Sequence, residues 1–181
     1  MSDPALSSMF LTRRQLLKVG LAGSAFLATA GLLAGLRRCA ADGPARDLAI
    51  LRETDLPFLH ATLPVLLAGS VAEAEMSLAV TTTIETMDAG LSRVSPEAQR
   101  QALQLFDVLT LPVVRGSLTG VWGRWEDADT IAIERFLQRW QNSSLRLLNM
   151  GYSALLQLVL LSWYGSPLSW THCAYPGPPK L

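Results

Sequence analysis

The sequence predicts an all-α protein: a small, irregular helical bundle that follows an N-terminal helix and ends in an extended, proline-rich arm. Three observations support this fold class. Apolar residues between 48 and 164 recur at the three- and four-residue spacing of helices. The same stretch has no convincing alternating strand pattern and no Asn-Gly or Asp-Gly hairpin turn. Serine, aspartate, proline and glycine stand where these helices are expected to begin and end.

Composition limits the chain to one domain and removes several classes of protein. The 181 residues are 50% hydrophobic and only 17% charged, which is typical of a folded chain and not of a disordered one. Fifteen basic and fifteen acidic residues give no net charge, and this argues against nucleic acid as a partner. Two cysteines and two histidines are too few for a four-cysteine zinc ribbon or a ferredoxin-type iron–sulfur site.

The charge is nevertheless divided along the chain. Residues 1–38 hold five basic residues and one acid, whereas residues 39–181 hold ten basic and fourteen acidic ones. Arg13-Arg14 precede a Leu-Leu-Lys sequence and the uncharged run 19–36. This pattern resembles a twin-arginine export signal, which carries folded proteins across the inner membrane to the periplasm. We therefore assign residues 1–40 to a signal or anchor and residues 41–47, rich in Gly, Pro and Ala, to a linker.

The fate of this N-terminal segment stays open. Ala28-Thr29-Ala30 fits a cleavage site, but the 18-residue run, about 27 Å as a helix, also suits an inner-membrane anchor. Arg37-Arg38 precede Cys39 where lipidation requires small residues, so a lipid anchor is not expected. Export implies an oxidising compartment, which leaves a Cys39–Cys173 disulfide as an open alternative.

The helical domain is expected over residues 48–164. Asp55 and Pro57 predict the start of a first helix, Pro64 a kink within it, and residues 71–92 a second helix. Ser95, followed by Pro96 and Glu97, predicts the start of the third, which Pro112 stops or bends.

A glycine-broken segment, 116–123, separates these helices from a fourth over 129–141. The last, 145–164, is apolar on nearly every side, so it is central to the bundle or lies in an interface. Its stretch Leu155–Leu161 is too short, and Arg146 and Gln157 are too near, for a membrane span. Residues 165–181 are expected to form an extended arm, because its prolines cannot continue a helix.

Nothing in the sequence indicates catalysis. It has no Gly-x-Ser-x-Gly elbow, no glycine-rich nucleotide motif and no cysteine pair for haem attachment. His60 is expected to be an ordinary helix residue, and His172 and Cys173 are too close in sequence to act together. The acids Glu126, Asp127 and Asp129 suit the start of a helix better than acid–base work. We expect no catalytic, cofactor-binding or metal-binding residue.

Aromatic residues gather in the C-terminal part of the chain, because all five tryptophans lie beyond position 120. Aromatic side chains dominate the binding energy of protein interfaces, although some of these must also fill the core. The candidate residues for a partner interface are Trp122, Trp125, Trp163, Tyr164, Trp170, Tyr175 and Pro176.

The order of these features resembles the small subunit of membrane-bound, FAD-dependent sorbitol, glucose and alcohol dehydrogenases, a family similar in role to gluconate 2-dehydrogenase subunit 3. The matching pieces are Arg13-Arg14, the segment 119–126 around its two tryptophans, and the ending 163–179 with its aromatic residues and prolines. Residues 45–110 match in helical character alone.

The resemblance implies an accessory subunit without catalytic activity or a cofactor of its own. Such subunits bind a large FAD-dependent dehydrogenase of the GMC type, help it mature, and carry it through the twin-arginine translocase to the periplasm. A cytochrome c subunit often receives the electrons. The alternative is a different class of protein: a stand-alone helical binding or structural protein, which is periplasmic or anchored in the membrane by residues 1–40.

Overall fold

A computed structural model describes residues 43–177, except for the side chains of residues 113, 114 and 172. Within this range the chain forms seven α-helices and two short 3-10 helices and no β-strand, so the all-α prediction is confirmed. The signal with Arg13 and Arg14, the Cys39 half of the expected disulfide, and residues 178–181 lie outside the described range.

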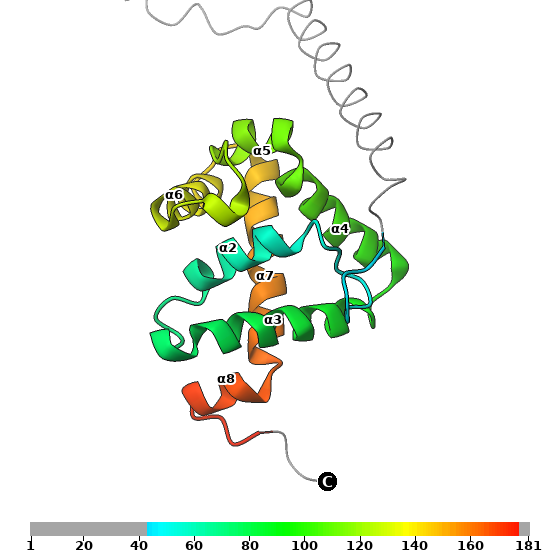
Figure 1. The fold of residues 1–181 in the computed structure, drawn as a ribbon, viewed down its shortest axis with the longest axis vertical. Helices are drawn as coiled ribbons and strands as arrows, with labels where there is room; N and C mark the ends of the chain where they lie inside the picture. The colour runs from blue at the N-terminus through cyan, green and yellow to red at the C-terminus, as the bar shows by residue number, and fades with distance from the viewer. Residues whose placement is uncertain (1–42, 178–181) are drawn as a thin grey trace, which may run out of the picture. The chain divides into compact units, whose positions relative to one another are not determined.

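The first two helices form a hairpin. Helix α2 (Leu56–Leu66) and helix α3 (Met76–Leu91) run in opposite directions and contact each other, joined by a turn and the 3-10 helix η1 (Glu73–Glu75) (Figure 1). Pro57 stands in the first turn of α2, where its missing N–H costs nothing. Asp55 precedes the helix as expected, but its carboxylate does not cap it.

The next two helices are separated by one extended residue. The Ser95 hydroxyl accepts a hydrogen bond from the Ala98 N–H and caps α4 (Pro96–Thr110), as predicted. Pro112 ends this helix, but it also begins α5 (Pro112–Thr119), so half of the expected glycine-broken segment is helical. Gly120 stops α5 with a φ of 76°, a left-handed conformation that glycine adopts without strain.

The last elements complete the bundle. The 3-10 helix η2 (Trp125–Asp127) leads into α6 (Thr130–Gln141), and α7 (Arg146–Tyr164) follows. In Figure 1, α7 passes behind the α2–α3 hairpin, and it contacts α2, α3 and α6. The hairpin and α6 thus pack around one face of α7.

Aromatic rings run through the core. Phe58 and Trp125 meet edge to face with ring centroids 5.0 Å apart, and Phe136 and Trp140 do so at 5.1 Å. The indole N–H of Trp125 donates to the Leu109 carbonyl oxygen at 3.0 Å. That of Trp140 donates to the Leu118 carbonyl oxygen at 3.0 Å, so both buried polar groups are paired. These contacts join α2, α4, α5, η2 and α6 into one core.

The prediction of an extended arm over residues 165–181 is wrong for its first part, because Pro167–His172 form a further helix, α8. Proline is compatible with the first position of a helix, and the Ser166 hydroxyl accepts the Leu168 N–H to cap it. The tail then turns back on itself. The Trp170 ring meets Tyr175 edge to face at 5.6 Å, and its N–H donates to the Tyr164 carbonyl oxygen at 3.1 Å.

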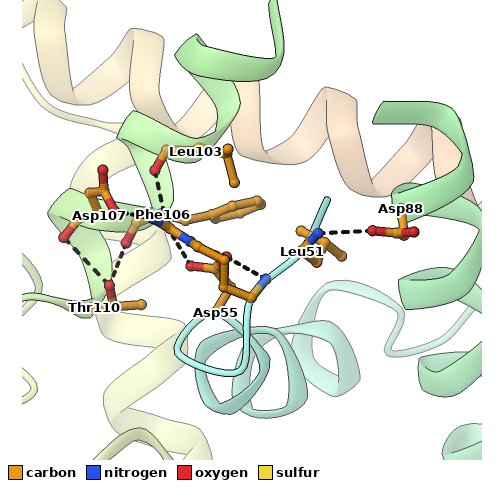
Figure 2. Close-up of polar contacts among 8 residues, drawn as sticks. Leu51, Asp55, Asp88, Leu103, Phe106, Asp107 and Thr110 are labelled. Carbon is orange, nitrogen blue, oxygen red and sulfur yellow. Dashed lines mark hydrogen bonds and ion pairs between the residues drawn. The ribbon is translucent and has the colours of Figure 1, made fainter. Parts of the chain in front are cut away.

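The segment before α2 is fixed to α3 by one carboxylate. Asp88, which is 6% exposed, accepts the backbone N–H groups of Ala49, Ile50 and Leu51, each at 2.8 Å. Figure 2 shows the bond from Leu51. Ala45 is also buried, and its N–H donates to the Leu51 carbonyl oxygen. Part of the expected linker 41–47 therefore packs on the domain.

Arg52 fixes the same segment to α4. Its guanidinium binds both carboxylate oxygens of buried Asp55 at 2.9 Å and one oxygen of Asp107 at 2.8 Å (Figure 2). Burial lowers the pKa of Arg52, but the hydrogen bonds and charges of Asp55 and Asp107 outweigh this and raise it. The guanidinium therefore stays charged, and it joins the start of α2 to the middle of α4.

Candidate functional site

An apolar groove of about 720 Å³ lies between α4 and α7. Its α4 wall consists of Ala98, Gln101, Ala102, Gln104, Leu105 and Val108. Its α7 wall consists of Leu147, Leu148, Met150, Gly151, Ala154, Gln157, Leu158 and Leu161. Leu118 of α5 and Trp140 of α6 complete the lining.

The lining contains no ionisable side chain. Its polar members are three glutamines, Gln101 and Gln104 on one wall and Gln157 on the other, and the remaining lining residues are apolar or glycine. Several of the apolar side chains are strongly exposed: Leu147 is 79% exposed and Leu161 is 75% exposed. Contiguous exposed apolar surface of this kind marks binding sites on soluble proteins.

The groove exists because α7 is apolar on two faces. Its inner face, with Leu155, Val159 and Trp163, is buried against the bundle, whereas the stripe through Leu147 and Leu161 faces outward. The sequence predicted that this helix is either central or in an interface; the structure confirms the central position for its inner face and leaves its outer stripe exposed. Among the described residues, α7 is the one helix whose length and mean hydropathy of 1.2 would allow a membrane span, so by length and composition the expectation that it is too short and too polar for one is wrong.

Small residues form part of the groove. A Cβ on Gly151 would lie 2.8 Å from the Trp140 ring, so this position cannot take a side chain without moving a core residue. Ala98, Ala102 and Ala154 keep both walls shallow. The groove therefore admits an object that approaches close to the backbone of α4 and α7.

The residues predicted for a partner interface differ in how far they are buried. Trp125 and Trp163 are buried in the core, so these two are removed from the candidate surface. Trp122 is 77% exposed, and its ring lies against Gly116. Trp170 is half-buried under the tail. The C-terminal residues Tyr164, Tyr175 and Pro176 are exposed, although none of them lines the groove.

A second cleft of about 480 Å³ lies between α2 and α6. Its lining includes His60, Glu126 and Glu134, with apolar residues and two prolines between them. Glu126 forms an exposed ion pair with Arg124 at 3.0 Å, and the hydrogen bond from Arg124 lowers the pKa of Glu126. In the described part of the chain, no three His, Cys, Asp or Glu side chains are grouped as metal ligands.

Sequence reasoning identified the helical character of α4 and the apolar character of α7, but not the groove between them. It also missed Asp88, whose partners lie 37–39 positions away, and Arg52, which binds Asp55 nearby but also reaches Leu103 and Asp107, 51 and 55 positions away. No local pattern marks such long-range contacts. Exposed Cys173 is described, but its proposed partner Cys39 is not.

Comparisons of the chain with protein-family models, with curated proteins and with solved structures find no match. The resemblance to dehydrogenase small subunits therefore depends on the sequence motifs quoted above. The geometry of the α4–α7 groove is an independent observation.

Proposed function

We propose that this chain is a non-catalytic accessory subunit that binds a large FAD-dependent dehydrogenase, helps it mature, and exports it to the periplasm by the twin-arginine pathway. The observation that supports this most is the uncharged groove between α4 and α7, which none of the described residues covers, beside a complete core.

The groove favours a protein partner because exposed leucines gain free energy when they are covered. Burying a leucine side chain contributes about 1.5–3 kcal/mol, and Leu147 and Leu161 are both mostly exposed. The domain does not need them for its own core, since the bundle around Phe58, Phe106 and Phe136 is closed without them. A surface that contributes nothing to folding is available for binding.

The signal supports the export role. The twin-arginine pathway carries folded proteins, and Arg13-Arg14 provide its motif. A folded dehydrogenase bound to this chain would cross the membrane with it, without a signal of its own. Assembly before transport would also allow FAD to be loaded in the cytoplasm.

The alternative, a stand-alone helical binding or structural protein, is favoured by the same complete core. The two functions differ in solution behaviour. After removal of residues 1–40, a stand-alone protein stays monodisperse, whereas an escort with an uncovered groove self-associates until its partner is added.

The decisive experiment measures export of the proposed FAD-dependent partner dehydrogenase. With the chain present, active flavoprotein should reach the periplasm, and deletion of the chain should leave it in the cytoplasm with less bound FAD. Arg13→Lys with Arg14→Lys should strand both proteins, whereas the control Arg37→Lys with Arg38→Lys should not. Export of active flavoprotein without this chain would contradict the proposed function.

A further inference from the structure

We propose that the α4–α7 groove receives one α-helix of the partner, which presents an uncharged aliphatic face about four turns long. This inference deepens the proposed function and rests on it for the identity of the partner. It adds how the partner binds, through one helix, and which surface of that helix is buried in the groove, an uncharged aliphatic one.

The length of the groove sets the length of its occupant. The α7 wall extends from Leu147 to Leu161, which is about 21 Å, or four helical turns. The α4 wall extends from Ala98 to Val108, about 15 Å. Alanine and glycine between the larger residues allow a third helix to approach to the 8–10 Å at which helices pack.

The chemistry of the walls selects a helix over an extended segment. An extended chain buried in the groove would need partners for its backbone N–H and C=O groups, and the walls offer only the side-chain amides of three glutamines. A helix pairs these groups within itself. Because no charged side chain lines the groove, a charged residue on the buried face of the occupant would have no partner.

Charge disfavours an anionic membrane as the occupant. Residues 43–177 contain nine arginines and thirteen acids, and the one charged residue of α7 is Arg146 at its first position. Peripheral binding to anionic lipids normally depends on a cluster of basic residues.

The area of α7 disfavours a second copy of this chain. A contact made by the outer stripe of α7 alone covers about 21 by 10 Å on each copy. This is far below the ~1,200 Å² that stable interfaces bury in total. A helix that belongs to a large subunit adds further contacts outside the groove.

Site-specific photocrosslinking in the full chain, in cells that also produce the dehydrogenase, tests the inference. The photoreactive residue p-benzoylphenylalanine replaces Leu147, Ala154 or Leu161 in the groove, or Leu78, an exposed apolar residue of α3, as the control. The three groove positions should crosslink to one helix of one other protein, at sites about seven residues apart from one position to the next. Leu78 should give no crosslink to that helix.

Crosslinks from the groove to lipid, to a second copy, to an extended segment, or to nothing would overturn the inference. Crosslinks to a helix of a protein without flavin would keep the contact mode and contradict the proposed function. If export of the dehydrogenase depends on this chain but crosslinks form only outside the groove, the proposed function is kept and the contact mode is contradicted.

A charge placed in the groove gives a second test. Ala154→Arg adds a guanidinium to an exposed position of the α7 wall, and Ser153→Arg adds the same group to the neighbouring exposed position outside the groove. The affinity for the dehydrogenase should fall at least tenfold for Ala154→Arg and stay within twofold for Ser153→Arg. Equal affinities of the two variants would contradict the inference.

Discussion

Asp88→Asn should destabilise the domain strongly, although the two side chains have nearly the same shape. The carboxylate of Asp88 accepts three backbone N–H groups at 2.8 Å each, two on Oδ1 and one on Oδ2. Asparagine keeps one acceptor oxygen and turns an NH₂ group toward the third N–H. A hydrogen bond to a charged group contributes about 1.5–3 kcal/mol and a neutral one about 0.5–1.5. The change removes one charged bond and weakens two.

The expected loss is about 2–4 kcal/mol, since the N–H groups of Ala49 and Ile50 are only partly buried and regain some hydration. Urea unfolding of the full-length chain, followed by tryptophan fluorescence, measures it, because Trp125, Trp140 and Trp163 are buried. Glu85→Gln, an equal charge change at an exposed position of the same helix, is the control and should shift stability by less than about 0.5 kcal/mol. Equal effects of the two variants would refute the role given to Asp88.

Three further substitutions test other parts of the structure. Arg52→Lys should cost at least one charged hydrogen bond, about 1.5–3 kcal/mol in the same urea assay, because an ammonium cannot bind Asp55 at two points and also reach Asp107; unchanged stability would contradict this. Trp163→Ala should destabilise by about 3–5 kcal/mol, whereas Trp122→Ser should change stability little, since Trp163 is 1% exposed and Trp122 lies on the surface; equal losses would argue against this difference in burial. Glu126→Gln should remove a small stabilisation that is present at pH 7 and lost as the pH falls through the lowered pKa of Glu126, so wild type and variant should unfold alike once the pH is below that pKa. A difference that grows on acidification would mean that the sign is wrong.

The positions of the helices were largely predictable because their signals are local. Ser95 caps a helix through the Ala98 N–H three residues away, and the long apolar run beginning at residue 145 is one helix. Pro112 does end α4, as predicted, but it also begins α5, which the sequence reasoning did not expect. Pro167 was misjudged: it was interpreted as excluding a helix, although proline is favoured at the first position of one, and it begins α8.

The site was less predictable because it depends on contacts between distant residues. All five tryptophans have similar local sequence signals, but Trp125 and Trp140 bind carbonyl oxygens 16 and 22 positions away and are drawn into the core. Trp122, three residues before Trp125, stays on the surface. The groove likewise depends on how far α4 stands from α7, which no spacing within either helix determines.

The two faces of α7 decide what can cover it. Its hydropathy and 19-residue length suit a bilayer, but Leu155, Val159 and Trp163 are buried where α7 contacts α3 and α6. If α7 left the bundle for a bilayer, lipid would cover α7 itself. The apolar faces of α3 and α6 that now pack against α7 would then be exposed to water. Each buried residue exposed in this way costs about 1.5–3 kcal/mol. A partner helix placed on the outer stripe covers Leu147 and Leu161 and leaves the inner contacts intact, so it gains free energy without this cost.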